Sequence, residues 1–218
     1  MVAVVTGGSR GIGRAIVAEF VRDGWQVLAP TRAELDLSDA SSIRGWCASL
    51  PAEIVVDAIV HSAGVNWPRP IEAVDEPIWQ ATMQVNVAAA LQLVQGLQPR
   101  LPGARIVMLG SILGLVSRPH RSAYSASKAA LQGLVRAMAV ELGPQQTLVN
   151  ALCPGYVDTD LTRANNSAAQ LEAIAATIPL RRLGTPTEVA RLAVWLCSRQ
   201  NTYLTGQSLV IDGGFTCQ

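Results

Sequence analysis

The sequence is short of charge. Only 15% of its 218 residues are charged, and 17 basic side chains set against 16 acidic ones leave a net charge of +1. A nucleic-acid groove or a strongly acidic partner needs charge of one sign in one place, and pairs such as Arg181-Arg182 are too short to supply it. We therefore expect no nucleic-acid partner.

Metal-binding side chains are equally scarce. The chain has four scattered cysteines and two histidines, and no two cysteines have metal-site spacing: Cys47, Cys153, Cys197, Cys217, His61 and His120. We expect no bound metal, and we interpret the cysteines as small buried hydrophobic residues or free thiols.

Long apolar runs and a secretory leader are also missing. No uninterrupted apolar stretch reaches the roughly 18 residues of a membrane span. Met1 leads straight into Val2-Ala3-Val4-Val5, with no basic segment before it. The prediction is a cytoplasmic protein that stays reduced and has no membrane partner.

What the chain has in abundance is hydrophobic residues, which make up half of it, enough for one domain with a substantial core. Short Val/Ile/Leu-rich runs predict strands at 2–5, 26–29, 58–61, 105–109, 148–152 and 208–211. Between them, helical periodicity predicts helices at 11–22, 38–50, 77–98, 122–142 and 187–197. This alternation favours an α/β fold, a Rossmann-like doubly wound parallel sheet. With no linker or repeat, residues 1–218 form a single domain.

A glycine-rich turn joins the first strand to the first helix. It reads Thr6-Gly7-Gly8-Ser9-Arg10-Gly11-Ile12-Gly13, with the glycines spaced G-x-x-x-G-x-G. Glycines let the backbone approach a pyrophosphate closely, and the helix N-terminus offers free N–H donors. The turn therefore predicts a dinucleotide site.

Three reactive side chains follow the fourth strand at a characteristic spacing. Ser111 precedes Tyr124 by thirteen positions, and Lys128 follows Tyr124 by four. Positions i and i+4 share one face of a helix, so the phenol and the ammonium can meet. A neighbouring cation lowers a phenol's pKa, so we expect Lys128 to lower that of Tyr124. The Ser111 hydroxyl could then hold a carbonyl oxygen against the phenol.

Taken together, these motifs closely resemble those of the short-chain dehydrogenases/reductases, particularly the single-domain kind that includes the 3-oxoacyl carrier-protein reductases. The resemblance covers essentially the whole chain and rests on Thr6-Gly7-x-x-x-Gly11-Ile12-Gly13, His61-Ser62-Ala63-Gly64, Asn86, Ser111, Tyr124-x-x-x-Lys128, Pro154-Gly155 and Ile211-Asp212-Gly213-Gly214. It implies hydride exchange between a nicotinamide dinucleotide and a carbonyl or secondary alcohol.

The resemblance also implies roles for four catalytic residues. Tyr124 would be the general acid and base, and Lys128 would tune it and bind the nicotinamide ribose. Ser111 would orient and polarise the substrate oxygen, and Asn86 would support a proton-relay water behind Lys128. No metal takes part.

Cofactor contacts are implied along much of the chain. The Val157 backbone would meet the carboxamide, the Thr159 hydroxyl the amide or pyrophosphate, and Asp36 the adenine. The full set is Gly7, Ser9, Arg10, Gly11, Ile12, Gly13, Arg32, Asp36, Leu37, Ala63, Gly64, Tyr124, Lys128, Pro154, Gly155, Val157 and Thr159.

Two departures from the family pattern are visible. His61-Ser62 replaces the usual Asn-Asn before Ala-Gly, and we interpret His61 as a hydrogen-bonded residue at a strand end. The family has a helix and then a third strand directly after strand 2. Here that segment is short, so this helix between strands 2 and 3 is missing, and Leu35 is the candidate for a short third strand before the predicted helix at 38–50.

The end of the second strand bears on the choice of cofactor. An acid there accepts the ribose hydroxyls of NAD, whereas arginine binds the 2′-phosphate of NADP. Here Ala29-Pro30-Thr31-Arg32 contains no acid, and Arg10 lies in the glycine turn, so NADP(H) is favoured over NAD(H). Glu34 is the counter-argument, because a short loop could turn it inward.

The substrate side is less well defined. Residues 156–185 are expected to form a lid. The expected substrate contacts are Ser111, Leu113, Tyr124 and Tyr156, with further walls at Ile112, Val116, Trp67 and Leu161. These mostly apolar walls favour an uncharged carbonyl compound. An anionic group could instead meet a set of basic residues, and both interpretations stay open: Arg69, Arg118, His120 and Arg121.

The leading hypothesis is an NADP(H)-dependent ketone reductase or alcohol dehydrogenase, with an NAD-dependent dehydrogenase as the variant within the family. A non-catalytic dinucleotide-binding sensor or scaffold is the alternative from another class. A sugar-nucleotide epimerase is disfavoured, because only 64 residues (218 − 154) follow Pro154. Small residues on the helices at 77–98 and 122–142 fit the homotetramer that the family implies, with a dimer as the second choice.

Overall fold

The computed structural model describes residues 1–218 and contains one six-stranded parallel sheet in the order β2-β1-β3-β4-β5-β6. The doubly wound Rossmann-like fold predicted from the sequence is confirmed. All six predicted strands are present: β1 (Val2–Thr6), β2 (Gln26–Leu28), β3 (Ala58–His61), β4 (Arg105–Leu109), β5 (Leu148–Pro154) and β6 (Ser208–Ile211).

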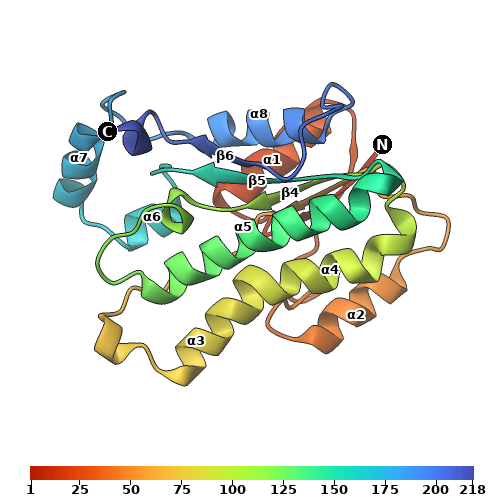
Figure 1. Cartoon of the computed structure of the whole chain (residues 1–218), viewed down its shortest axis with the longest axis horizontal. Helices are drawn as coiled ribbons and strands as arrows, with labels where there is room; N and C mark the ends of the chain where they lie inside the picture. The colour runs from red at the N-terminus through yellow and green to blue at the C-terminus, as the bar shows by residue number, and fades with distance from the viewer.

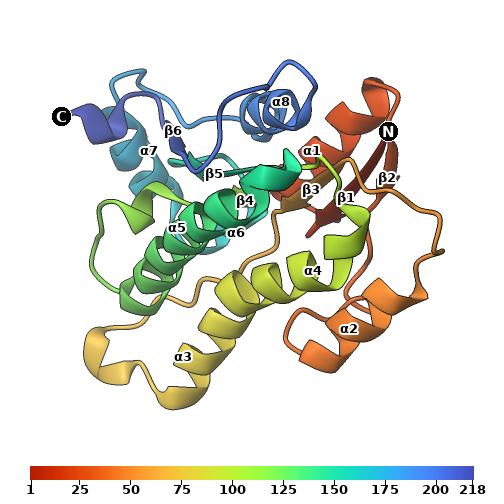
Figure 2. The same cartoon turned by 45° about the vertical axis from the view of Figure 1, so that its right-hand side comes forward.

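Helices cover both faces of the sheet (Figures 1 and 2). On one face lie α1 (Gly11–Arg22) and α8 (Pro186–Cys197), and on the other α2 (Ala40–Ser49), α4 (Ala89–Leu97) and α5 (Ser122–Leu142). The remaining α-helices are α3 (Glu76–Met83), α6 (Asp160–Ala164) and α7 (Ala168–Thr177). No helix combines the length and the apolar character that a membrane crossing requires.

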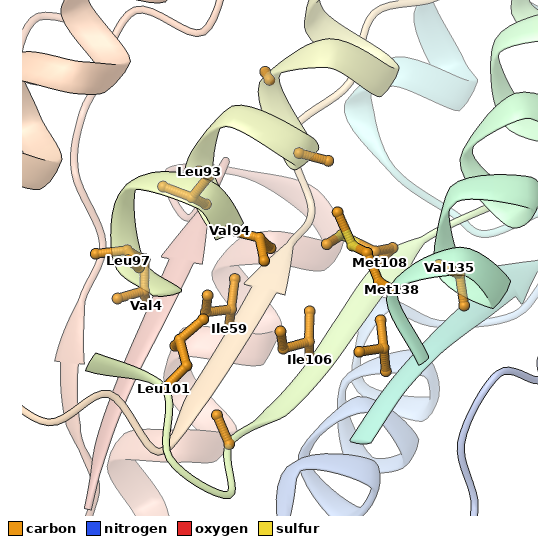
Figure 3. Packing of buried hydrophobic residues seen from close by; sticks show 14 of the residues in the cluster. Val4, Ile59, Leu93, Val94, Leu97, Leu101, Ile106, Met108, Val135 and Met138 are labelled. Carbon is orange, nitrogen blue, oxygen red and sulfur yellow. The ribbon is translucent and has the colours of Figure 1, made fainter. Parts of the chain in front are cut away.

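Two hydrophobic clusters hold these layers together. The larger joins alternate strand residues to α2, α4 and α5, as Ile59, Ile106 and Met108 show where they meet Leu93 and Met138 (Figure 3). The other joins the opposite strand faces to α1 and α8. Strands buried on both sides explain the near-continuous apolar runs in the sequence.

Side-chain caps fix where several helices begin. The Asp39 and Asp75 carboxylates accept hydrogen bonds from the backbone N–H groups of Ser41 and Ile78, at 2.8 and 2.9 Å. Thr185 and Glu188 form a reciprocal capping box at the start of α8. These caps satisfy N–H groups that have no partner within a helix.

The connection after β2 is as short as expected, but it contains no strand. Residues 29–39 form turns, and the Leu35 N–H donates to the carbonyl of Thr31 at 2.9 Å. The prediction of a short third strand at Leu35 is wrong, because this local bond curls the chain before it can run beside β2. Leu35 is nevertheless 4% exposed and belongs to the core.

The predicted helix at 77–98 is not one continuous α-helix. A π-helical stretch, Gln84–Ala88, separates α3 from α4 and contains Asn86. Such widened turns leave backbone carbonyls in altered positions and are frequent at functional sites. Here the Nε2 atom of His61 lies 3.3 Å from the Val85 carbonyl oxygen, a partner outside the helix.

His61 ties three elements together at the carboxyl edge of the sheet. It ends β3, its Nδ1 atom lies 3.1 Å from the Thr6 hydroxyl at the end of β1, and its Nε2 atom faces the π-helical stretch. The side chain is fully buried. It is thus a hydrogen-bonded strand-end residue, as the sequence suggested. Burial, together with the charge of Lys128, lowers the pKa of His61 to about 4.

This pKa predicts a specific loss of stability in mild acid. His61 has an ordinary pKa of 6.5, lowered to about 4 in the fold, so the unfolded chain binds more protons between these values. Stability should therefore fall as the pH drops from 6.5 to 4, by up to about 3 kcal/mol, since one pKa unit is worth about 1.4 kcal/mol.

Urea unfolding of the wild type and of His61→Asn at pH 7 and pH 5 measures this dependence. His61→Asn should lose most of the difference between the two pH values, whereas His120→Asn, a change at an exposed site, should keep it. An unchanged pH dependence in His61→Asn would show that His61 is not the group responsible.

Candidate active site

A cavity of about 700 Å³ opens at the carboxyl ends of the strands, between the glycine-rich turn and the start of α5. In a doubly wound sheet this edge is where successive connections leave in opposite directions, so a crevice forms there. Every cofactor contact expected from the resemblance lines this cavity: Gly7, Ser9, Arg10, Gly11, Ile12, Gly13, Arg32, Asp36, Leu37, Ala63, Gly64, Tyr124, Lys128, Pro154, Gly155, Val157 and Thr159.

The glycine-rich turn is packed too tightly for side chains. Gly7 has φ +69°, and a Cβ there would lie 2.8 Å from the backbone of Ala63. At Gly13 a Cβ would lie 2.1 Å from the carbonyl oxygen of Gly7. Arg10 precedes α1 without a side-chain cap, so the first N–H groups of α1 have no side-chain partner there. This cradle fits a dinucleotide pyrophosphate.

Two arginines line the cavity, one in the glycine-rich turn and one in the connection after β2. Arg10 and Arg32 both line it, and the Arg32 side chain is 84% exposed, with Nε 3.5 Å from a carboxylate oxygen of Asp36. Glu34 does not line the cavity, because its Oε2 accepts two bonds of 2.8 Å from the N–H and hydroxyl of Thr31. The inward turn of Glu34 considered from the sequence is therefore absent.

Asp36 is held in place by its neighbours. Its Oδ1 accepts from the Ser38 hydroxyl at 2.6 Å and from the Ser38 N–H at 2.9 Å. These hydrogen bonds lower the pKa of the Asp36 carboxyl, and the Arg32 charge adds to the effect. Asp36 thus stays ionised at the rim of the cavity, next to Leu37.

Tyr124 and Lys128 lie on one face of α5, as their spacing predicts. The Lys128 Nζ is 5.6 Å from the centroid of the Tyr124 ring, and both residues line the cavity. Lys128 is 3% exposed, and its Nζ donates to the carbonyl oxygen of Leu109 at 2.6 Å. Burial lowers the pKa of Lys128 to about 8, against a smaller opposing effect of Cys153.

The acidity of Tyr124 differs from the expectation. Burial raises the pKa of the phenol, while a hydrogen bond from Ser111 and the charge of Arg121 lower it. In the protein alone the net shift is upward, and the Lys128 ammonium donates its hydrogen bond to the Leu109 carbonyl.

Ser111 stands at the end of β4, next to Tyr124. It is 8% exposed, and its Oγ accepts a hydrogen bond of 3.1 Å from the Leu113 N–H, which begins a short 3₁₀ turn. The Leu113 bond uses only an acceptor position of the hydroxyl, so Ser111 can turn its proton to a carbonyl oxygen held beside the phenol.

Asn86 is fully buried behind the cavity wall. Its Oδ1 accepts from the Val65 N–H at 2.8 Å, and its Nδ2 donates to the Val65 carbonyl at 3.0 Å and to the Ser127 hydroxyl at 2.9 Å. Asn86 thus clamps the loop after Ala63-Gly64 to α5. A Cβ at Gly64 would lie 3.3 Å from Asn86 and 3.6 Å from the Lys128 Nζ.

The far wall follows β5. Val157 is 4% exposed and lines the cavity, while the Thr159 hydroxyl caps α6 by accepting from the Thr162 N–H at 3.2 Å. Asp160 and Thr162 also line this wall, although the sequence interpretation did not include them. Their position directly after the Pro154-to-Thr159 motif is the signal that could have pointed to them.

The residues expected on the substrate side are divided between the cavity wall and its surroundings. Trp67 and Leu161 line the cavity beside Ser111 and Tyr124. Four other residues expected there do not line it: Leu113, Tyr156, Ile112 and Val116. Leu113 is a core residue, 9% exposed, in the 3₁₀ turn against α5. Tyr156 packs against Phe215 with ring centroids 5.4 Å apart and lines a smaller neighbouring hollow.

No group of three or more His, Cys, Asp and Glu side chains is arranged to hold a metal ion. The cavity brings together the glycine-rich turn, the arginines Arg10 and Arg32, and the Tyr124 phenol with the Lys128 ammonium and the Ser111 hydroxyl. This is a set that can bind a dinucleotide and exchange a proton with a substrate oxygen.

Comparison with known proteins agrees with this geometry. A family model described as "Enoyl-(Acyl carrier protein) reductase" matches residues 29–216, and one described as "short chain dehydrogenase" matches residues 1–42. A rhamnolipid-biosynthesis 3-oxoacyl-[acyl-carrier-protein] reductase of Pseudomonas aeruginosa is 34% identical, over 98% of this chain and 95% of its own.

Solved structures give the same result. A putative NAD(P)-dependent gluconate 5-dehydrogenase from Beutenbergia cavernae, with bound NADP, superposes with a TM-score of 0.94 at 34% identity, covering 100% of this chain and 97% of its own. The RhlG/NADP complex from Pseudomonas aeruginosa superposes with a TM-score of 0.90 at 33% identity, covering 98% and 95%. This chain belongs to the short-chain dehydrogenase/reductase family of oxidoreductases.

Proposed function

We propose that the protein is an NADP(H)-dependent reductase that interconverts a ketone and a secondary alcohol. The observation that carries this proposal is the placement of Ser111, Tyr124 and Lys128 in the same cavity as the glycine cradle. The cofactor, when bound, supplies or accepts a hydride at its nicotinamide ring. The protein must then transfer one proton to or from the substrate oxygen and position both the dinucleotide and the substrate.

The chain's own residues account for the proton transfer. Ser111 donates a hydrogen bond to the substrate oxygen and holds it beside the Tyr124 Oη. In reduction, Tyr124 gives its proton to that oxygen, and in oxidation it takes a proton from it. Lys128 contributes a fixed positive charge near the phenol, which stabilises the phenolate that forms. Asn86 keeps the Val65 backbone and Ser127 in place behind this group.

Three observations support NADP(H) over NAD(H). Arg10 and Arg32 both line the cavity, and a guanidinium is a suitable partner for the 2′-phosphate of NADP. Glu34, the one nearby acid that could oppose a phosphate, is bound to Thr31 and points elsewhere. The two superposed structures named above hold NADP.

The substrate is proposed to be a carbonyl compound of modest size. One relative acts on a 3-oxoacyl group carried by a protein, and one structural neighbour is named for gluconate. Both reactions interconvert a ketone and a secondary alcohol, which is the chemistry that Tyr124 and Ser111 can perform.

A non-catalytic sensor on the same fold is the weaker alternative. A sensor needs the glycine cradle but neither Ser111 nor Tyr124. Here the phenol, the hydroxyl and the buried ammonium lie together in the cavity, although burying Lys128 without a carboxylate is costly. The cost of burying this ammonium favours a catalytic role for Lys128 over a non-catalytic one.

Residues 156–185 are proposed to act as a lid. Backbone bonds anchor both ends of the segment, since Gly184 N–H donates to Tyr156 and Asp158 N–H donates to Gly184, each at 2.9 Å. Between them, α7 has no buried residue, while Leu161 in α6 lines the cavity. A weakly packed helix between two anchored ends can move as a unit over the substrate.

We further propose that the protein assembles as a homotetramer, with a dimer as the second choice. Apolar side chains are exposed on α4 and α5, at Leu91 (37%) and Val140 (78%). If these positions lie in a subunit interface, Val140→Asp should lower the mass measured by sedimentation equilibrium. An unchanged mass would exclude α5 from the interface at that position.

Tyr124→Phe tests the proton donor. Removing the phenolic oxygen should lower kcat for NADPH-linked ketone reduction by about 10²–10⁴-fold, because the general acid is lost while the cavity keeps its shape. The rate is followed by NADPH absorbance across a panel of ketones, 3-oxoacyl thioesters and quinones. NADPH binding, measured by its fluorescence, should remain.

Tyr203→Phe is the matched control, because Tyr203 is 95% exposed and lies outside the cavity. It should behave as the wild type. Turnover retained by Tyr124→Phe would remove Tyr124 from its assigned role.

Arg32→Ala tests the preference for NADP(H). Losing one exposed phosphate partner should weaken NADPH binding by roughly three- to tenfold and change NADH binding by less than about twofold. Fluorescence titration with each cofactor measures both affinities. Arg14→Ala removes the same charge from an exposed site outside the cavity, and it should affect neither. Equal losses for both cofactors in Arg32→Ala would contradict the phosphate role.

A further inference from the structure

The short connection after β2 contains a single isolated turn whose first residue binds a glutamate. The sequence Thr31-Arg32-Ala33-Glu34 has the spacing of a capping box, in which a glutamate reaches back to the N–H of the residue that starts a helix. Here the Glu34 Oε2 accepts from both the N–H and the hydroxyl of Thr31, at 2.8 Å each. The Leu35 N–H donates to the Thr31 carbonyl at 2.9 Å, and no helix follows this turn directly.

This turn belongs to the wall of the cavity that contains the glycine cradle. Thr31 and Arg32 both line the cavity, whereas Glu34 does not. Because the Glu34 carboxylate accepts two bonds from Thr31, it is held against a residue of the cavity wall without being part of that wall. The two bonds therefore decide on which side of Thr31 this negative charge is placed.

No cation in the protein neutralises Glu34. None of the ion pairs includes it, and the neighbouring Arg32 has its Nε 3.5 Å from the Asp36 carboxylate instead. Its hydrogen bonds from Thr31 lower the pKa of the Glu34 carboxyl, so the group is ionised at neutral pH. Thr31 also supplies both hydrogen bonds that the carboxylate accepts, so this one residue holds the charge in place.

A carboxylate on the cavity side of Thr31 would change which dinucleotide binds best. The ribose hydroxyls of NAD donate hydrogen bonds to a carboxylate, whereas the 2′-phosphate of NADP is repelled by it. Arg10 and Arg32 line the same cavity and attract a phosphate. The preference for one cofactor is then the difference between this attraction and any repulsion from Glu34.

We propose that Thr31 determines the cofactor preference by holding Glu34 away from the cavity. Arg10 and Arg32 attract the 2′-phosphate, and Thr31 withdraws a carboxylate that would oppose it. The proposal deepens the proposed function and rests on it for the cofactor and for the cavity in which the cofactor binds. Releasing Glu34 from Thr31 should therefore shift the protein toward NAD(H).

Thr31→Val removes the hydroxyl bond to Glu34 and keeps the branched shape of the side chain. Its ratio of NADPH affinity to NADH affinity should fall about three- to tenfold below that of the wild type, because the carboxylate loses one of its two hydrogen bonds and can turn to the cavity. Fluorescence titration with each reduced cofactor measures the ratio, and circular dichroism checks the fold. Thr31→Ser keeps both bonds and should keep the wild-type ratio.

A second substitution in the same chain tests whether Glu34 carries the effect. In Thr31→Val/Glu34→Gln the released side chain is neutral, so the ratio should return to within about twofold of the wild type. Glu53→Gln removes the same charge from an exposed site outside the cavity, so Thr31→Val/Glu53→Gln should keep the lowered ratio. Glu34→Gln alone should change the ratio by less than about twofold, because an amide oxygen still accepts from Thr31.

The outcomes separate the role of Thr31 from the proposed reaction. An unchanged ratio in Thr31→Val would overturn that role, and so would a large rise in Glu34→Gln alone. A lowered ratio that persists in Thr31→Val/Glu34→Gln would also overturn it, because Thr31 would then act on the phosphate directly. None of these results contradicts NADP(H)-dependent reduction.

A wild type that binds NADH as well as NADPH would contradict the proposed cofactor instead. A shift toward NADH in Thr31→Val that Glu34→Gln reverses would still support the role of Thr31 in that case.

Discussion

The hydrogen bond between the Lys128 ammonium and the Leu109 carbonyl, at 2.6 Å, is the interaction on which the site depends. It ties α5 to the carboxyl end of β4 and thereby sets where Tyr124, one turn earlier, meets the cavity. The ammonium is 3% exposed and has no carboxylate beside it, so its surroundings must tolerate an uncompensated charge. Burial brings the pKa of Lys128 down to about 8, which still leaves the group largely protonated at pH 7.

The neighbours of Lys128 are consistent with that requirement. His61 is fully buried and held neutral at pH 7, with hydrogen bonds to Thr6 and to the π-helical stretch that contains Asn86. Asn86 in turn fixes the Val65 backbone. The ends of β1 and β3, the π-helical stretch and the start of α5 are therefore linked through neutral partners around one buried cation. A dinucleotide and a phenolate would be the natural counterparts of that charge.

Much of this could be predicted from local patterns in the sequence, and the exceptions share a cause. The strands 58–61, 105–109 and 208–211 and the helices 11–22 and 122–142 have the predicted bounds, because apolar periodicity and the glycine turn act over short distances. The π-helical stretch pairs its Val85 carbonyl with His61, 24 residues away in the sequence, and Leu35 curls back through a local turn instead of joining the sheet. Likewise, the sequence spacing placed Lys128 beside Tyr124, but only the folded arrangement shows that burial raises the pKa of the phenol.

The central claim is that this cavity transfers a hydride between NADPH and a carbonyl carbon while Tyr124 supplies the proton. The most direct measurement uses NADPH deuterated at C4 in each of its two configurations, with mass spectrometry and NMR of the alcohol formed from a reducible ketone. A single cradle would hold the nicotinamide in one orientation relative to Ser111 and Tyr124, so deuterium from one of the two isomers alone should appear on the carbinol carbon. Deuterium from neither isomer, or equally from both, would contradict hydride transfer in this site.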